Sequence, residues 1–203
     1  MLNVTQLTKT FGAKIAVSDV SFTIAPGEIF ALIGPNSSGK TTIVKSILGM
    51  LAFEKGTIVV DGIDVAKKPV EAKARIGYIP DEPVAWSGMT GEEFLHFVSA
   101  LYDVSPTTRA ERIARMLPVF HLESIEKEYF TAYSRGNKQK FSILSALLHE
   151  PKLLLVDEPI VGLDPESAII AKGEFIRFAK EGGAVLLVTH TLSVAEEIAH
   201  RIG

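Results

Sequence analysis

The stretch Gly34-Pro35-Asn36-Ser37-Ser38-Gly39-Lys40-Thr41 decides the fold of this chain. The apolar run 29–33 before it predicts a short strand, and a helix is expected to begin at Lys40. Glycine at both ends lets the loop turn closely, so that several backbone N–H groups and the N-terminus of the helix point at one spot. A spot of this kind is suited to bind phosphate.

The spacing of this stretch is G-x-x-x-x-G-K-[ST], the pattern of a phosphate-binding loop. Lys40 is expected to reach the β and γ phosphates of a nucleotide, and the Thr41 hydroxyl to bind Mg²⁺. A chance match in a glycine-containing turn is the alternative, and the position between a strand and a helix argues against it. The candidate phosphate-binding residues are Gly34, Pro35, Asn36, Ser37, Ser38, Gly39, Lys40, Thr41 and Thr42.

The composition indicates a globular protein of 203 residues, with 47% hydrophobic and 22% charged residues. A net charge of -3, from 21 Lys and Arg against 24 Asp and Glu, gives no electrostatic reason to expect nucleic acid as a partner. The absence of cysteine excludes disulfides and fits a reducing compartment. No signal peptide or apolar run of membrane-spanning length is visible, so we expect a cytoplasmic chain.

The first part of the chain predicts a mixed sheet rather than a simple βαβ repeat. The turn-rich segment 10–14 separates two β segments, and an Asp61-Gly62 turn predicts a hairpin. The expected elements are β segments at 2–7 and 22–24, strands at 28–33 and 76–80, a hairpin at 56–62 and a helix at 69–75.

The pattern then changes to helical spacing. Thr90 and Glu93 form a capping box, and a second helix is expected over 106–118 with its charges facing solvent. We expect an inserted helical subdomain at about 88–150, within a core made of residues 1–87 and 151–203. The residues expected to face inward are Phe94, Leu95, Val98 and Leu101 in the first helix, and Ile113, Ala114, Met116 and Leu117 in the second.

The run 153–158 is a continuous apolar strand that ends in Asp157 and Glu158, which predicts a central strand buried on both faces. Downstream of a phosphate-binding loop, Asp157 is expected to hold Mg²⁺ opposite Thr41, and Glu158 to lie where water can attack the γ-phosphate. The alternative is a polar turn at a strand end. A helix at 165–180 and a second buried strand at 184–188 follow.

Five motifs occur in an order that resembles the ATP-binding-cassette (ABC) ATPases. The resemblance covers essentially the whole chain. It implies an α/β fold: a P-loop NTPase core with a mixed sheet flanked by helices, an inserted α-helical subdomain and an N-terminal antiparallel β subdomain. It also implies ATP and Mg²⁺ as cofactors. The motifs are residues 34–41, 133–140, 153–158 and 162–164, and His190.

The resemblance assigns roles to single residues. Phe11 matches the aromatic residue that stacks on adenine, although a core phenylalanine is the alternative. Glu158 resembles the general base that polarises water. His190 resembles the switch histidine that touches the γ-phosphate, where a structural histidine is the alternative.

The resemblance also implies a dimer with two ATP sites, each shared between subunits. Ser134 and Gly136 match the signature residues that face the partner's γ-phosphate. Arg135 stands where Gly is usual and Asn137 where Gln is usual, and Arg135 adds positive charge near phosphate or contacts the neighbouring subunit. Asp164 resembles the residue that links the two sites.

Asp81 stands where many relatives carry Gln, and as a carboxylate it can approach Mg²⁺ but cannot donate a hydrogen bond. Together with residues 133–140, this acid is most similar to the bacterial ABC-2 type exporters. Relatives usually continue past Arg201-Ile202-Gly203 into a further strand and helix. We therefore expect the C-terminal end to be truncated.

The function expected from these residues is that of the ATP-hydrolysing subunit of a membrane transporter. ATP would close a homodimer or heterodimer, and the movement would drive a transmembrane permease subunit at the inner face of the cell membrane. The permease would dock near Val84-Ala85-Trp86, although Trp86 could instead pack inside the subdomain. The alternatives are a soluble cassette ATPase that acts on ribosomes or DNA, and a regulatory nucleotide binder without turnover.

Overall fold

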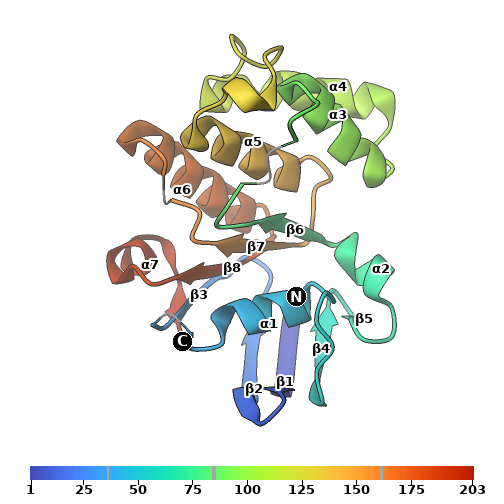
Figure 1. Ribbon diagram of the computed structural model, residues 1–203, viewed down its shortest axis with the longest axis vertical. Coiled ribbons are helices and arrows are strands. Elements are labelled where there is room, and N and C mark those ends of the chain that lie inside the picture. Colours follow the sequence, from blue (N-terminus) through green and yellow to red (C-terminus); the bar gives the residue numbers. More distant parts are fainter. Residues whose placement is uncertain (36, 84–85, 161) are drawn as a thin grey trace.

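The computed structural model describes residues 1–35, 37–83, 86–160 and 162–203. Two sheets and seven α-helices are arranged in layers in this part of the chain (Figure 1). None of the described helices combines the length and the apolar character that crossing a membrane requires.

A five-stranded parallel sheet lies at the centre, with the strand order β6-β7-β8-β3-β9. Because all its strands run the same way, their carboxyl ends meet at one edge of the sheet. The strands are β3 (Ile29–Ile33), β6 (Ile76–Ile79), β7 (Leu153–Asp157), β8 (Ala184–Thr189) and β9 (Arg201–Ile202).

The last strand corrects one expectation. We expected a further strand to begin only beyond Gly203, but Arg201 and Ile202 already form β9 and pair in parallel with Phe30 and Ala31 of β3. The backbone N–H of Gly203 also donates to the carbonyl oxygen of Ala31 at 2.8 Å.

A four-stranded antiparallel sheet, in the order β2-β1-β4-β5, forms the lower layer in Figure 1. Asp61 and Gly62 both have positive φ, 48° and 80°, which confirms the predicted tight turn between β4 and β5. The first two strands extend further than predicted because bulges in β1 let the pairing continue to the turn at residues 12–13. The strands are β1 (Leu2–Phe11), β2 (Lys14–Ile24), β4 (Lys55–Val60) and β5 (Ile63–Asp64).

Strand β7 is buried on both faces, as predicted. Leu154 and Val156 belong to the core beneath the upper helices, whereas Leu153 and Leu155 belong to the core shared with α1 and the antiparallel sheet. Side chains alternate along a strand, so a strand between two cores needs an apolar residue at every position.

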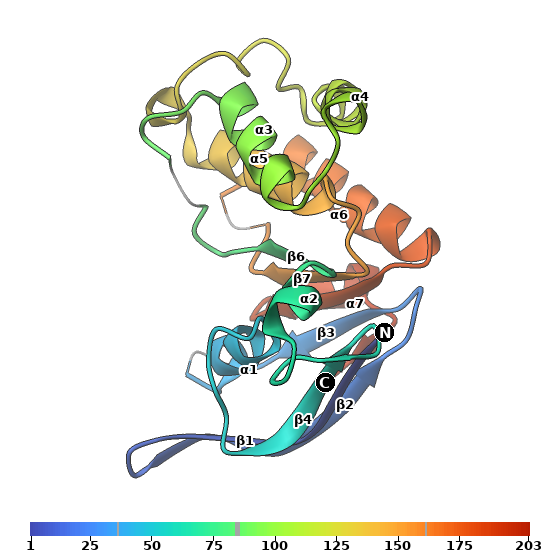
Figure 2. The same cartoon turned by 90° about the vertical axis from the view of Figure 1, so that its right-hand side faces the viewer.

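The helices cover both faces of the parallel sheet. Figures 1 and 2 show α5 and α6 above it, α3 and α4 further out, and α1 between the two sheets. They are α1 (Lys40–Ile47), α2 (Pro69–Lys73), α3 (Gly91–Leu101), α4 (Pro106–Met116), α5 (Arg135–Leu147), α6 (Pro165–Lys180) and α7 (Leu192–Ile198), with 3₁₀ turns at Pro118–Phe120 and Phe130–Ala132.

The capping box of α3 is confirmed, because Thr90 Oγ1 accepts from the Glu93 N–H and the Glu93 carboxylate accepts from the Thr90 N–H. Two residues expected to face inward are exposed: Leu101, 66% exposed in the last turn of α3, and Ala114 in α4. Helical periodicity marks a face, but not how far the neighbouring element covers it. Two charged residues of α4 that were expected to face solvent instead bond to the backbone, because Arg109 donates to the His96 carbonyl oxygen at 2.9 Å and Arg112 to the Leu148 carbonyl oxygen at 2.6 Å.

Candidate functional site

The carboxyl edge of the parallel sheet gathers the loops that follow β3, β6, β7 and β8. Ile33 at the end of β3 pairs with Thr189 at the end of β8, and Asp157 at the end of β7 pairs with Val188. Segments far apart in the sequence therefore meet here, and ligands of open parallel sheets bind at such an edge.

A cleft of about 390 Å³ opens at this edge. It brings together the predicted phosphate-binding loop, the acids of β7 and the predicted adenine contact. Asn36 lies outside the described residues. The lining residues are Phe11, Lys14, Ile15, Ala16, Ser37, Gly39, Lys40, Thr41, Thr42, Asp81, Asp157 and Glu158.

The backbone of the phosphate-binding loop requires its second glycine. Gly39 has a φ of +98°, and a β-carbon there would lie 2.5 Å from the carbonyl oxygen of Ala16 in β2. The first glycine, Gly34, packs closely as well, since a β-carbon on it would lie 2.6 Å from Ser38 Oγ. The loop is thus packed against β2 at Gly39, where only glycine fits, and against the Ser38 side chain at Gly34.

The positive groups of the loop converge at its mouth. Lys40 Nζ donates to the carbonyl oxygens of Gly34 and Pro35, at 2.6 and 2.9 Å. Helix α1 begins at the same lysine, with no side-chain cap and no acidic residue in its first turn. Its first N–H groups and its dipole therefore face the cleft together with the ammonium group, which suits a polyphosphate.

The acids stand opposite this positive end. Burial, followed by the negative charges of Asp81 and Glu158, raises the pKa of Asp157 to about 6. A divalent cation would relieve this crowding of carboxylates, and Mg²⁺ is commonly held by one or two carboxylates, a hydroxyl and substrate phosphates. Thr41 and Asp157 line the same cleft, so their oxygens fit a magnesium site that the phosphates of a nucleotide would complete. No group of three or more His, Cys, Asp or Glu residues suited to a metal occurs in the described ranges.

Glu158 is held by three hydrogen bonds. Its Oε1 accepts from the His190 backbone N–H at 2.7 Å and lies 2.6 Å from His190 Nδ1, while its Oε2 accepts from Thr189 Oγ1 at 3.0 Å. An ionised carboxylate only accepts, so Nδ1 carries the proton in this contact. The structure thus brings the two predicted catalytic residues into direct contact and adds Thr189, which we did not predict.

Phe11 does not belong to the core. Its ring is 51% exposed at the end of β1, lines the cleft, and has Lys9 Nζ at 5.2 Å from its centroid. The core alternative is therefore wrong. The hairpin also contributes Lys14, Ile15 and Ala16 to the cleft, which we did not predict because no motif marks them.

The signature residues lie at the N-terminus of α5, and none of them lines the cleft of their own chain. Ser134 caps this helix, its Oγ accepting from the Asn137 N–H at 3.2 Å. Gly136 lies close to the next loop, since a β-carbon on it would be 3.1 Å from the Gly162 carbonyl oxygen. Within one chain, the structure does not bring these residues to the phosphate-binding loop.

Asp164 caps α6. Its carboxylate accepts from the Ser167 N–H at 2.9 Å and from the Ser167 hydroxyl at 2.5 Å, and these bonds lower its pKa. Lys140 of α5 lies 3.9 Å away. This acid therefore fixes the start of α6 next to the signature helix.

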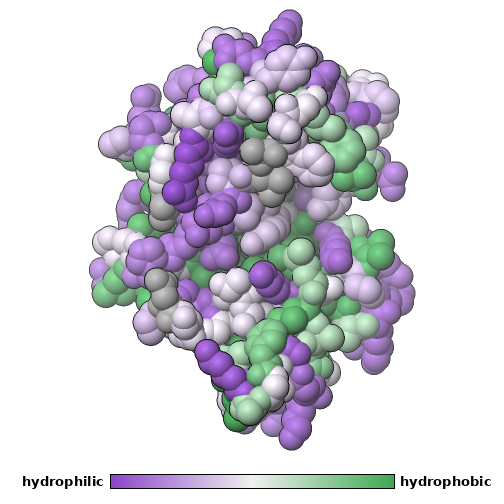
Figure 3. Space-filling model, viewed as in Figure 1, coloured by the Kyte–Doolittle hydropathy of each residue, from purple (hydrophilic) through white to green (hydrophobic). Residues whose placement is uncertain are grey.

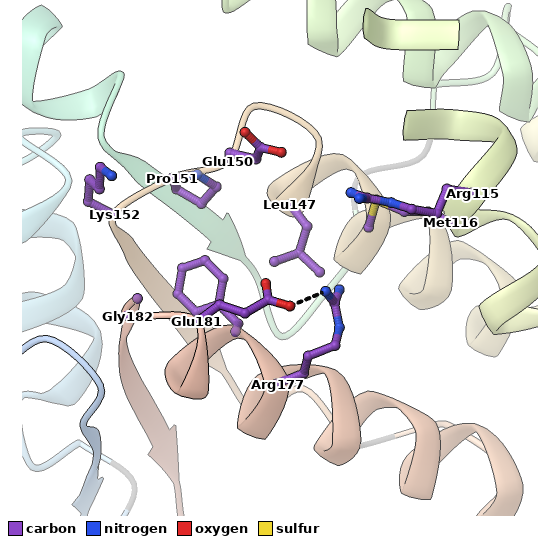
Figure 4. Close-up of a pocket in the computed structure, with 11 residues that line it drawn as sticks. Arg115, Met116, Leu147, Glu150, Pro151, Lys152, Arg177, Glu181 and Gly182 are labelled. Carbon is purple, nitrogen blue, oxygen red and sulfur yellow. Dashed lines mark hydrogen bonds and ion pairs between the residues drawn. The ribbon is translucent and has the colours of Figure 1, made fainter. Parts of the chain in front are cut away.

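A second cavity, of about 280 Å³, lies at the opposite edge of the parallel sheet, directly before β7 and β8 (Figure 4). Arg115 and Met116 of α4 face Leu147 of α5 across it, and Arg177 pairs with Glu181 at 2.9 Å. Its basic and acidic groups largely compensate one another, and none of the predicted site residues lines it.

The fold and the cleft define a P-loop nucleotide-binding protein of the α/β class. The family model described as ABC transporter matches residues 17–161, and the chain belongs to this family. It is an ABC-type ATPase domain, and the predicted fold class is confirmed.

Known relatives agree with this assignment. The ABC-type transporter ATP-binding protein EcsA of Bacillus subtilis is 38% identical over 97% of this chain and 79% of its own length. The linearmycin resistance ATP-binding protein LnrL of the same organism is 32% identical over the whole chain and 65% of its own length. A solved ATP-binding subunit of an ABC transporter, 34% identical, superposes with a TM-score of 0.94 over 98% of this chain and 83% of its own.

Proposed function

We propose that the chain binds ATP with Mg²⁺ in the cleft at the carboxyl edge of the parallel sheet and hydrolyses it as the energy-supplying subunit of an exporter. The observation that carries this proposal is the convergence of Lys40, the start of α1, Asp157 and Glu158 on one cleft. Mg²⁺, held by Thr41 and Asp157 with Asp81 nearby, would neutralise phosphate charge when bound.

Glu158 is the proposed general base. A carboxylate offers about four acceptor positions, and three donors from Thr189 and His190 occupy three of them. The remaining position can accept a proton from a water that attacks the γ-phosphate. The imidazole of His190 and the hydroxyl of Thr189 orient this carboxylate, while Lys40 and the loop N–H groups hold the phosphates.

The signature residues Ser134, Arg135, Gly136 and Asn137 are proposed to act on the nucleotide of a second ATPase domain. They are displaced from the cleft of their own chain, so a dimer, of like or unlike subunits, is required to use them. In the dimer, Asp164 would connect the two sites, and Phe11 would stack on adenine.

A transmembrane permease subunit is the proposed partner, at the inner face of the membrane and without a role for nucleic acid. The name of LnrL, a resistance protein, supports an exporter. Val84 and Ala85 lie outside the described residues, but Trp86 is 41% exposed and packs on Phe97 with ring centroids 5.7 Å apart. Hydrophobic residues also gather in a strip on the lower half of the face in Figure 3, over the strands below α1.

Affinity purification from gently solubilised native membranes tests the transport role. We expect a multispanning protein to copurify in stoichiometric amount. Recovery of ribosomal proteins or DNA-repair factors, with no membrane protein, would instead favour a soluble cassette ATPase.

A further inference from the structure

One face of the first turns of α5 contacts the segment that follows β6. Arg135 Nη2 lies 3.7 Å from Asp81 Oδ1, and Gln139, one turn further along, donates from Nε2 to the Pro80 carbonyl oxygen at 3.3 Å. Gln139 is fully buried, whereas Arg135 and Asp81 are each about half exposed. The buried amide anchors the contact, and the ion pair forms at its rim.

The stem of Arg135 is guided toward Asp81 by the loop before α6. A β-carbon on Gly162 would lie 3.1 Å from both Cδ and Nε of Arg135, and Gly162 has a φ of +89°. A side chain at position 162 would therefore press on the arginine. Because residue 162 is a glycine, the side chain of Arg135 has room to extend to Asp81.

Asp81 belongs to the cleft as well as to this ion pair. It lines the cleft with Asp157 and Lys40, and its charge acts on Asp157. Arg135 does not line the cleft, so within its own chain it acts on a bound cation through its ion pair with Asp81. When Arg135 neutralises Asp81, less negative charge remains to attract a divalent cation.

We propose that Arg135 is a positioning residue that acts through Asp81 and sets how strongly Mg²⁺ contributes to nucleotide binding in the same chain. This inference rests on the proposed function of the cleft. Positions 81 and 135, like position 137, are motif positions at which the chain departs from the residues usual in the family that it resembles.

The test measures binding of a fluorescent, non-hydrolysable ATP analogue in excess MgCl₂ and in excess EDTA. The dissociation constant in EDTA divided by that in MgCl₂ reports how much Mg²⁺ contributes to binding. Arg135→Gln should raise this ratio by about two- to fivefold, the effect of an exposed ion pair, and Asp81→Asn should lower it. In the Asp81→Asn background, Arg135→Gln should have no further effect. With Asp81 intact, Arg135→Lys keeps the positive charge and should give a ratio near that of the wild type.

Lys138→Gln is the matched control, because it removes a positive charge from the same turn of α5, whereas the ion pair with Asp81 is made by Arg135. Its effect on the ratio should be the same with and without Asp81. A purely structural role of Arg135 would change both dissociation constants equally and leave the ratio constant. An unchanged ratio in Arg135→Gln, or an equal change in the Asp81→Asn background, would overturn the inference.

The same assay separates this inference from the proposed function. If Lys40→Ala loses binding but Arg135→Gln leaves the ratio of dissociation constants unchanged, only the inference fails. If Lys40→Ala binds the analogue as tightly as the wild type, the nucleotide site is misplaced and both proposals fall.

Discussion

His190 Nδ1 lies 2.6 Å from Oε1 of Glu158, and the same oxygen also accepts from the His190 backbone N–H at 2.7 Å. The carboxylate is largely shielded, with 14% of the side chain exposed, while the imidazole is 57% exposed toward solvent. The residue directly after β8 therefore fixes the acid directly after β7. This relationship motivates the first two predictions.

Glu158→Gln should retain ATP binding and reduce kcat by about 10²- to 10⁴-fold, because an amide cannot accept the proton of the attacking water. With ATP and Mg²⁺ it should accumulate as a dimer, detected by size-exclusion chromatography with light scattering. Glu111→Gln, at an exposed position of α4, is the control and should hydrolyse ATP normally. Turnover by Glu158→Gln at the wild-type rate would show that another group is the base.

Thr189→Val should lower kcat by about tenfold with little change in ATP affinity. Valine keeps the volume of this buried residue but removes the hydroxyl that donates to Glu158 Oε2 at 3.0 Å, and a hydrogen bond to a charged group contributes about 1.5–3 kcal/mol. Steady-state kinetics that give separate kcat and KM values check this. A rise in KM with unchanged kcat would place the hydroxyl in nucleotide binding instead.

Gly39→Ala should destabilise the protein by about 1–3 kcal/mol and abolish ATP binding. Its backbone φ of +98° is unfavourable for alanine, and the new β-carbon would lie 2.5 Å from the Ala16 carbonyl oxygen. Gly173→Ala is the counterpart within α6, where a β-carbon meets nothing within 4 Å, and it should stabilise by about 0.5–1 kcal/mol. Urea unfolding measures the change in the free energy of unfolding for both variants. Equal changes would contradict a strained backbone at Gly39.

His149 should make stability sensitive to acid. Burial lowers its pKa to about 4, and its ring stacks on Tyr102 with centroids 3.7 Å apart. The unfolded state, with a pKa of about 6.5, binds the proton more readily. The contribution of neutral His149 to the free energy of unfolding is therefore fully present above about pH 6.5. As the pH falls toward 4, up to about 3 kcal/mol of it is lost.

His149→Phe keeps an aromatic ring against Tyr102 but cannot titrate, so its unfolding free energy should fall less steeply than that of the wild type between pH 6.5 and 4. Chemical unfolding at several pH values gives the slope of unfolding free energy against pH for each protein. Because both proteins carry the same carboxylates, the difference between the two slopes reports His149 alone. Identical slopes would contradict a lowered pKa of His149 in the folded protein.

Contiguous motifs could be predicted from the sequence, and contacts between distant segments could not. The loop at residues 34–41 and the end of β7 were located because each lies within one strand-to-loop transition. The ion pair of Arg135 with Asp81 depends on how α5 packs against β6, which no local pattern records. Leu101 fits a helical stripe equally well whether or not a neighbour covers it, and the structure leaves it exposed.

The most direct measurement is the affinity of the wild type and of Lys40→Ala for ATP with Mg²⁺, determined by isothermal titration calorimetry on the Glu158→Gln background. Lys152→Ala, an exposed lysine before β7 at the opposite edge of the sheet, is the control. We expect Lys40→Ala to lose at least about tenfold in affinity, as removal of a charged phosphate contact implies, and Lys152→Ala to bind normally. Equal affinities of the Lys40→Ala and wild-type proteins would contradict an ATP site in this cleft.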